Sequence, residues 1–315
     1  MRALALVAMV AGCEPRLTGV ELGAVPDSCA RFADGIDQGR LVSDVAALAA
    51  APRASEARRE ETRAYILRAL AEAGTPGEEA PFTISGLDGA NVIAGSGVVL
   101  VGAHFDSVAD APGADDNASG VAVTLAVARA LGPRVRYAFF DLEEPRRAMV
   151  GSDGRNYAFG SQAYVDSLEN REVRVALIVE SVGFTCESCQ KLPPGLPAGA
   201  APQDGRGVYL VGNLDGAPAW SAVQAAFKLV LRGPYAAYPF VVAGNGKSLP
   251  QSRFSDNAPF WDARIDALMI TDTANLRNPN YHKDTDVPAS IDGAYLAGVA
   301  RGTVVAAGAL AGLCR

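Results

Sequence analysis

The sequence predicts an α/β fold: a three-layer αβα sandwich in which a mixed, mainly parallel central sheet lies between two layers of helices. Three observations lead to this prediction. Short apolar runs alternate with amphipathic stretches along the chain. The 315 residues, 49% of them hydrophobic, can bury one large core. Polar, chemically reactive segments follow the apolar runs, as expected where loops gather beyond the carboxyl ends of parallel strands.

The elements follow one another in a regular order. Residues 54–73 are charged on one side and apolar on the other at helical spacing, which predicts an amphipathic helix. The segment near 295–313 is apolar but contains Arg301 and glycines, so we expect a helix packed on the core rather than a membrane span. Between these two helices we expect strands at 91–93 and 97–104, a helix at 119–131, a strand at 134–142, a helix at 161–168, strands at 173–182 and 208–211, a helix at 217–231 and a strand at 267–271.

The N-terminus has the pattern of an export signal. Residues 1–12 are expected to be a lipoprotein-type signal peptide, because Arg2 precedes an apolar run and residues 10–13 resemble a bacterial lipobox. Cys13 would then carry a lipid anchor, the only expected link to a membrane. An ordinary cleaved signal and a misplaced start are the alternatives. Residues 13–40 are expected to form a leader and 41–315 a single domain, in a protein that is a cell-envelope lipoprotein or is secreted or periplasmic.

Charge and cysteine content narrow the partners and the compartment. The net charge of -7 offers no basic stripe, so we expect no nucleic-acid partner. The even number of remaining cysteines suits disulfides in an oxidising compartment, with Cys186 joined to Cys189 and Cys29 to Cys314. A redox or zinc role for Cys186 and Cys189 is the alternative, although no second CxxC pair and no spare histidine completes a zinc site.

The two histidines, His104 and His282, both stand in acidic company. A lone histidine is more often a satisfied surface or core residue than a ligand. Three acidic clusters lie between the two histidines in the sequence, and the clusters rather than either histidine alone suggest a metal site.

Each acidic cluster can be interpreted as a structural feature or as part of a metal site. Asp116 precedes a predicted helix, where an Asp-Asn pair would by default form a turn and N-cap. Glu143 and Glu144 end a strand, and adjacent carboxylates repel each other unless a cation lies beside them. Glu180 interrupts an apolar strand, which is costly unless it is paired or bound to a metal. Imidazoles and carboxylates together suit Zn²⁺, and a shared carboxylate suits a two-metal site.

The order of these motifs resembles the M28 family of zinc peptidases, such as the Streptomyces and Aeromonas (Vibrio) secreted aminopeptidases. The matching residues are His-Phe-Asp-Ser at 104–107, Gly-Ala-Asp-Asp-Asn-Ala-Ser-Gly at 113–120, Glu-Glu at 143–144, Glu180 before a Val-Gly, and Tyr-His at 281–282. The resemblance covers residues 98–286. It implies a zinc aminopeptidase/phosphorylase-hydrolase-like fold and makes residues 41–315 a single M28-like peptidase domain.

The resemblance also implies a cofactor, namely two Zn²⁺ ions. Asp116 would bridge both ions. His104 and Glu180 would complete one site, and Glu144 and His282 the other.

The expected chemistry is that of an aminopeptidase acting on peptides with a free N-terminus, in a chain that is expected to be monomeric. Glu143 would be the general base, and Glu143 and Glu180 would face the substrate amine. Tyr281 would donate a hydrogen bond to the developing oxyanion, packing being the alternative role. Asp106 would accept the proton of the second ring nitrogen of His104 and hold its tautomer.

The chain departs from the family pattern in two places. Glu180 stands where the best-known members have Asp, so the ion at that site is expected to be held more weakly or with a shifted preference. Residues 145–149 lack the usual Gly-rich turn, which leaves the shape of the substrate pocket open. A single-zinc glutaminyl-peptide cyclotransferase and a non-catalytic peptidase-like binding module are the alternative functions, and metal stoichiometry separates them from the aminopeptidase.

Overall fold

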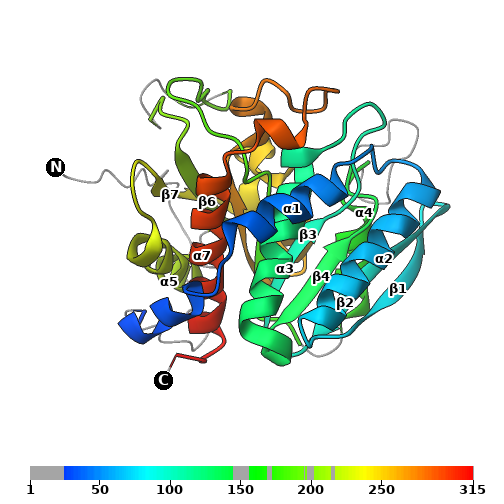
Figure 1. Cartoon of the computed structure of the whole chain (residues 1–315), viewed down its shortest axis with the longest axis horizontal. Coiled ribbons are helices and arrows are strands. Elements are labelled where there is room, and N and C mark those ends of the chain that lie inside the picture. Colours follow the sequence, from blue (N-terminus) through cyan, green and yellow to red (C-terminus); the bar gives the residue numbers. More distant parts are fainter. Residues whose placement is uncertain are drawn as a thin grey trace.

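The computed structural model describes residues 25–144, 156–168, 172–194, 196, 202–213 and 217–314. The expected signal peptide with Cys13, and residues 145–149, lie outside the described residues. Within the described part, the chain folds as the predicted three-layer αβα sandwich, with one sheet between two layers of helices (Figure 1).

The described strands form one sheet in the order β1-β2-β4-β3-β5-β8-β6-β7. The strands β4, β3, β5 and β8 run parallel to one another, whereas β1 and β2 join antiparallel at one edge and β6 runs antiparallel to β8. The carboxyl ends of the four central strands therefore meet at one edge of the sheet. The bounds are β1 Gly77–Ile84, β2 Leu87–Gly95, β3 Val99–His104, β4 Arg136–Phe140, β5 Val175–Glu180, β6 Gly207–Asn213, β7 Ala236–Val242 and β8 Asp266–Thr271.

Helices cover both faces of this sheet. One face carries the short 3-10 helix η1 (Asp27–Ala33) and helices α1 (Gln38–Leu48), α2 (Glu56–Glu72), α3 (Gly120–Leu131), α5 (Ala217–Val230) and α7 (Gly293–Leu310), while the other carries α4 (Phe159–Ser167) and α6 (Asn257–Asp262).

Strand β5 shows why both faces are apolar. Leu177 and Val179 belong to the core beneath α3 and α7, while Ala176 and Ile178 belong to the core beneath α4 and α6. Successive side chains of a strand point to opposite faces. A strand that is buried on both sides therefore reads as a continuous apolar run.

The central elements match the sequence predictions, and the differences lie at the edges. Strands β1 and β7 and helices α1 and α6 were not predicted, and β2 extends well beyond the expected residues 91–93. Strand β1 alternates between exposed and half-buried positions and contains Pro81, so it lacks the apolar run of a central strand. Helix α1 begins inside the expected leader, where the Asp37 side chain accepts the backbone N–H groups of Gly39 and Arg40.

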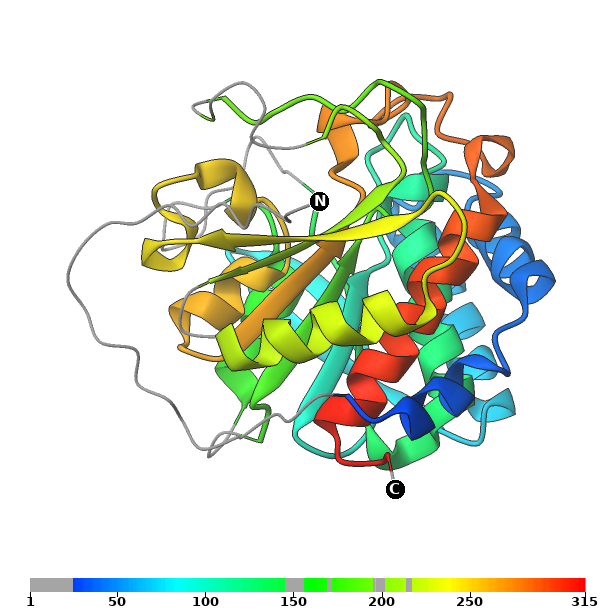
Figure 2. The ribbon, with the colours of Figure 1, turned by 90° about the vertical axis from the view of Figure 1, so that its left-hand side faces the viewer.

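Both disulfides have the expected pairing, Cys29 with Cys314 and Cys186 with Cys189. The first ties η1 to the chain just beyond α7, and Figure 2 shows the C-terminus beside the dark blue N-terminal helix. Helix α7 is long and apolar enough to cross a membrane, but 72% of it is buried inside the protein. It is the terminal core helix that the sequence predicted.

Candidate metal and catalytic site

The side chains expected to hold metal come together at the carboxyl edge of the central strands. His104 is the last residue of β3, and Glu180 is the last residue of β5. Glu144 follows β4 after a short turn. Asp116 lies in the helical turn Ala114–Ser119 that leads into α3, and its peptide bond to Asn117 is cis. Parallel neighbouring strands explain how residues so distant in sequence become neighbours.

These residues form two groups that share one carboxylate. In the first, the His104 Nε2 atom lies 3.3 Å from an oxygen of Asp116 and 3.3 Å from an oxygen of Glu180. In the second, the His282 Nε2 atom lies 3.1 Å from the other oxygen of Asp116 and 3.1 Å from Glu144. Asp116 thus presents one oxygen to each group, which is the arrangement that a bridging ligand requires.

The donor atoms of this site fit two metal ions. The potential ligand atoms within each group lie within 4.8 Å of one another. Within the described residues, the buried Asp116 Oδ2, Glu144 Oε1 and His282 Nε2 atoms make no hydrogen bond of favourable geometry, although Asp116 Oδ2 and His282 Nε2 are only 3.1 Å apart. Unpaired buried polar atoms are rare in folded proteins. Their gathering at one point is explained by a ligand, and the imidazole and carboxylate donors suit Zn²⁺.

The charges of the two groups depend on one another. Burial alone would lower the pKa of His104, but the carboxylates of Glu180 and Glu143 raise it well above its ordinary value. Burial would likewise lower the pKa of His282, yet the adjacent carboxylates of Asp116 and Glu144 raise it to about 10. Burial raises the pKa of Glu144 to about 7, and the Asp116 charge adds to this rise. The raised pKa values therefore favour the protonated forms of these side chains when no metal is bound.

Glu143 lies beside both groups but belongs to neither. One of its oxygens is 3.9 Å from His104 Nε2, and only 6% of the residue is exposed. Burial raises its pKa well above the ordinary value; His104 opposes the rise, whereas the charges of Asp256 and Glu180 add to it. A carboxylate with an elevated pKa has the proton affinity that a general base at neutral pH requires.

Asp106 has a wider structural role than the sequence suggested. The His104 Nδ1 atom lies 3.2 Å from the backbone oxygen of Asp106 and 3.5 Å from its carboxylate. The same carboxylate accepts the backbone N–H groups of Glu143 at 3.0 Å and Glu144 at 3.2 Å. It therefore aligns the end of β3 with the Glu pair that follows β4.

Two further side chains support the ligands through contacts that the sequence does not show. Asp286 accepts the backbone N–H of Asp115 at 2.9 Å and of Asp116 at 3.1 Å. Ser255 donates to Glu180 at 2.8 Å, which fixes one oxygen of this longer side chain. Short polar residues in loops carry no periodic signal, so only the folded chain shows what they contact.

Tyr281 stacks on His282, with ring centroids 3.8 Å apart and an interplanar angle of 16°. Burial raises the pKa of its phenol well above the ordinary value, and the Asp116 and Glu144 carboxylates add to this effect. The hydroxyl thus remains protonated near neutral pH and can act as a hydrogen-bond donor.

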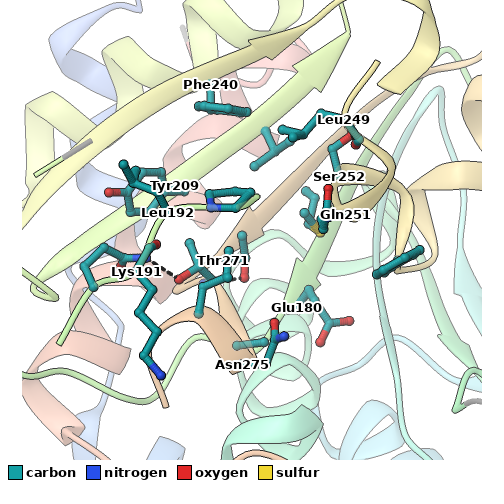
Figure 3. A pocket seen from close by; sticks show the side chains of 18 of the residues that line it. Glu180, Lys191, Leu192, Tyr209, Phe240, Leu249, Gln251, Ser252, Thr271 and Asn275 are labelled. Carbon is teal, nitrogen blue, oxygen red and sulfur yellow. Dashed lines mark hydrogen bonds between the residues drawn. The ribbon is translucent and has the colours of Figure 1, made fainter. Parts of the chain in front are cut away.

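An apolar pocket of about 180 Å³ opens directly beside this cluster, with Glu180 and Tyr281 among its lining residues (Figure 3). The sequence does not reveal this pocket, because its walls come from β6, β7, β8 and several separate loops. Most of the lining is apolar or aromatic, including Leu192, Pro193, Tyr209, Val211, Phe240, Leu249, Phe254 and Met269.

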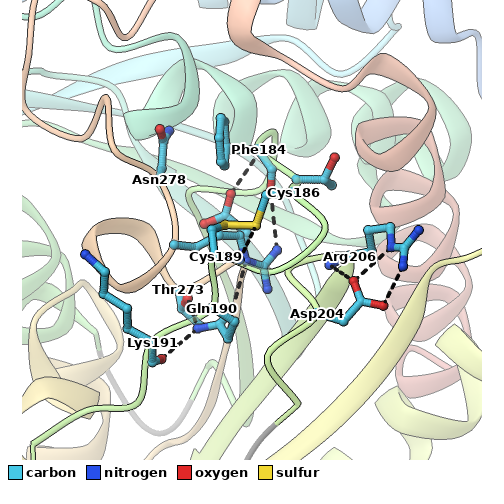
Figure 4. Close-up of a disulfide and its surroundings, with 12 residues drawn as sticks. Phe184, Cys186, Cys189, Gln190, Lys191, Asp204, Arg206, Thr273 and Asn278 are labelled. Carbon is cyan, nitrogen blue, oxygen red and sulfur yellow. Dashed lines mark hydrogen bonds and ion pairs between the residues drawn. A yellow bond between two sulfur atoms is a disulfide. The ribbon is translucent and has the colours of Figure 1, made fainter.

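The disulfide between Cys186 and Cys189 lies next to Gln190, which forms part of one wall of this pocket (Figure 4). Gln190 follows Cys189 directly, donates to the Thr273 hydroxyl at 2.8 Å and accepts from Arg277 at 2.9 Å. Gln190 and Thr273 both line the pocket. Because Cys186 and Cys189 are bonded to each other and belong to neither potential metal group in the described chain, a zinc role for this pair is not supported.

The fold and the two groups of potential ligands define the class of this protein as an α/β sandwich with a candidate metal site at the carboxyl edge of its sheet. Residues 83–306 match the model of the peptidase family M28, and the chain belongs to this family. This confirms the resemblance that the motifs indicated.

Relatives and solved structures agree with this assignment. The chain is 30% identical over 260 residues to the uncharacterized protein YfbL of Escherichia coli, covering 76% of this chain and 77% of that protein. It is 29% identical over 180 residues to the aminopeptidase YwaD of Bacillus subtilis, covering 54% of this chain and only 31% of YwaD. The Legionella pneumophila LapA aminopeptidase has a similar fold, with a TM-score of 0.70, 13% identity and coverage of 94% and 78%. A Bacteroides thetaiotaomicron glutaminyl cyclase is also similar, with a TM-score of 0.64, 16% identity and coverage of 86% and 97%.

Proposed function

We propose that this protein is a zinc-dependent aminopeptidase that removes N-terminal residues from peptides, using two ions bridged by Asp116 and Glu143 as the general base. The observation that supports the proposal is that two groups of potential ligands share Asp116, while Glu143 lies beside them and belongs to neither group. The M28 family assignment independently supports peptide hydrolysis.

The side chains divide the chemistry between them. When bound, two zinc ions would polarise the scissile carbonyl and lower the pKa of water. Glu143 would accept a proton from the attacking water and return it to the leaving amine. Tyr281 would donate a hydrogen bond to the oxygen that develops negative charge. Asp106 would hold the orientation of His104 and of the backbone at Glu143.

The surroundings of the site suit the N-terminal residue of a peptide. The carboxylates of Glu180 and Glu143 can face its ammonium group. The apolar pocket beside Glu180 can accept its side chain, and the lining favours leucine-like and aromatic residues. We therefore propose that large apolar N-terminal residues are preferred over alanine.

The competing function is a single-zinc glutaminyl-peptide cyclotransferase. The similarity of fold to a glutaminyl cyclase is the observation that favours it. The first ligand group argues for two ions instead, because His104, Asp116 and Glu180 are together and buried. The apolar lining of the pocket also offers a glutamine side chain little compensation for lost hydration.

Zinc content measured together with hydrolysis of leucine nitroanilide tests the proposal. We expect about two zinc ions per chain, and in Glu143→Gln a loss of kcat/KM of about 10²–10⁴-fold with unchanged zinc content. Glu60→Gln, on the exposed face of α2, is the control and should retain wild-type activity. One zinc ion, with ammonia released from a glutamine-leading peptide, would favour the cyclase. Absence of both zinc and hydrolysis would favour a binding module.

We further propose that the chain is exported and acts as a monomer, with a lipid on Cys13 as its only membrane anchor. The support is the lipobox-like pattern at residues 10–13. Mass spectrometry of the mature N-terminus and membrane fractionation of Cys13→Ser test this proposal. A soluble wild-type protein with an unmodified N-terminus would contradict the anchor.

A further inference from the structure

A buried arginine in the loop between α1 and α2 contacts the segment between His104 and Asp116. Arg53 has no exposed surface and precedes the segment that matches the family model. Within the described residues its guanidinium bonds to carbonyl oxygens and forms no ion pair. The acceptors are Phe105 at 2.6 Å, Leu48 at 3.1 Å, Pro112 at 2.5 Å and Gly113 at 2.9 Å.

Three of these acceptors lie at the two ends of the single loop, residues 105–113, that leads from His104 at the end of β3 to the turn that holds Asp116, and the fourth is at the end of α1. Phe105 follows His104 directly, and Gly113 precedes Asp116 by three residues. The rigid, planar guanidinium therefore holds the two ends of this loop at a fixed distance from each other. The backbone N–H of Arg53 adds a further link, because it donates to the Ser107 hydroxyl at 2.9 Å.

The backbone at Gly113 leaves room for the Arg53 guanidinium. Gly113 has a φ of +66°, a conformation that side chains rarely adopt. A Cβ atom at this position would lie 2.8 Å from the Arg53 Nη2 atom. The glycine thus allows the guanidinium to approach the loop closely.

The positive charge of Arg53 also interacts with carboxylates at the site. Burial lowers its pKa to about 10, while the carboxylates of Asp106, Asp116, Asp286 and Glu144 act in the opposite direction. A buried cation bonded only to neutral groups is unfavourable unless opposite charges lie nearby. The acidic side chains of the ligand groups supply these charges, so the arginine and the site are electrostatically linked.

We propose that Arg53 is a positioning residue for the metal centre. It fixes the spacing between His104 and Asp116, and thereby the affinity for the ion held by His104, Asp116 and Glu180, without touching metal or substrate. This inference rests on the proposed function, because it requires the two groups to bind zinc.

The position of Arg53 makes the expected effect unequal. The first group contains both ligands that flank this loop, His104 and Asp116, whereas the second group contains only Asp116 of the two. Removing the guanidinium should therefore weaken the first site more than the second. A purely structural arginine would lower stability and leave zinc affinity unchanged.

Zinc dissociation constants of the metal-free full-length protein, measured by competition with a chelator, test the proposal. We expect Arg53→Lys and Arg53→Gln to weaken binding about 10–100-fold when only the first group is intact, in a His282→Ala background. The loss should be smaller in a Glu180→Ala background, which leaves the second group. Ser107→Ala, a milder change in the same set of contacts, should weaken the first site several-fold and keeps the test usable if an Arg53 variant fails to fold.

Arg129→Gln is the matched control, because it removes an ion pair with Asp44 well away from the site. Its melting temperature should fall while zinc binding stays as in the wild type. Folded Arg53→Lys and Ser107→Ala proteins that bind zinc within twofold of the wild type would overturn the inference alone. A wild-type protein that binds no zinc would overturn the proposed function, and the inference with it.

Discussion

The metal-facing and pocket-facing regions of the site are built differently. The potential ligands lie at the ends of β3 and β5, after β4, in the turn before α3 and in the loop at His282. Hydrogen bonds hold three of them, through the backbone N–H groups of Asp116 and Glu144 and the carboxylate of Glu180. The pocket is formed by apolar side chains from β6, β7, β8 and the loop after the short disulfide. Directed hydrogen bonds therefore position the metal-facing residues, whereas apolar packing shapes the pocket.

This difference separates chemistry from specificity. The metal region needs particular residue types, because only nitrogen and carboxylate donors suit zinc and only a base can accept the proton. The pocket needs a shape, which many combinations of apolar residues can provide. Perturbing one region should thus leave the function of the other largely unchanged.

The largest expected effect concerns pH and the metal region. In the metal-free protein the pKa of His282 is raised to about 10 and that of Glu144 to about 7, so zinc must displace protons from both near neutral pH. Zinc affinity should therefore rise with pH by about tenfold per unit for each proton released, or at least about 100-fold between pH 6 and 8. Chelator competition at the two pH values measures the change.

His282→Ala is the control for this prediction and should show a shallower dependence, because one displaced proton is lost with the side chain. Affinity that does not change with pH would show that the second group is not protonated in the metal-free protein. Hydrolysis of different N-terminal residues should keep the same order of preference across this range.

The next effect isolates the pocket. Phe240→Ala removes an aromatic wall, and we expect kcat/KM for leucine nitroanilide to fall about tenfold, since filling an apolar pocket discriminates by about 1–3 kcal/mol. Activity on alanine nitroanilide should stay within about twofold, because the smaller residue gains little from this wall. Unchanged zinc content would show that the metal region is intact. An equal loss on both substrates would contradict the separation of the two regions.

The smallest catalytic effect is expected at the short disulfide. Replacing Cys186 and Cys189 with serine should loosen one wall of the pocket and raise KM for the leucine substrate about threefold, equivalent to about 0.7 kcal/mol.

Replacing Cys29 and Cys314 provides the contrast, because this bond closes a loop of 285 residues. Its loss should reduce the free energy of unfolding by about 3–5 kcal/mol and leave KM unchanged. Chemical denaturation and steady-state kinetics on both double variants measure these effects. A KM change only in the Cys29 and Cys314 variant would reverse the assignment of roles.

The central fold could be predicted because buried strands and amphipathic helices leave periodic apolar patterns. Strand β5 reads as an uninterrupted apolar run that ends at Glu180, and the structure places this strand between two others. The edge elements could not be predicted in the same way. Strand β7 is half-buried and depends on pairing with β6, so its sequence carries only part of the signal.

The sequence by itself determined the family, the central strands and the five potential ligands, because these depend on residue types that few other environments tolerate. Only the tertiary structure decided how Asp116 faces both histidines, how Asp106 joins the Glu pair to His104, and where the pocket opens. Arg53 belongs to the second category. Its role depends on the loop of residues 105–113, which Arg53 meets only in the folded chain, and an isolated arginine before a helix shows nothing of the carbonyl groups that it will bind.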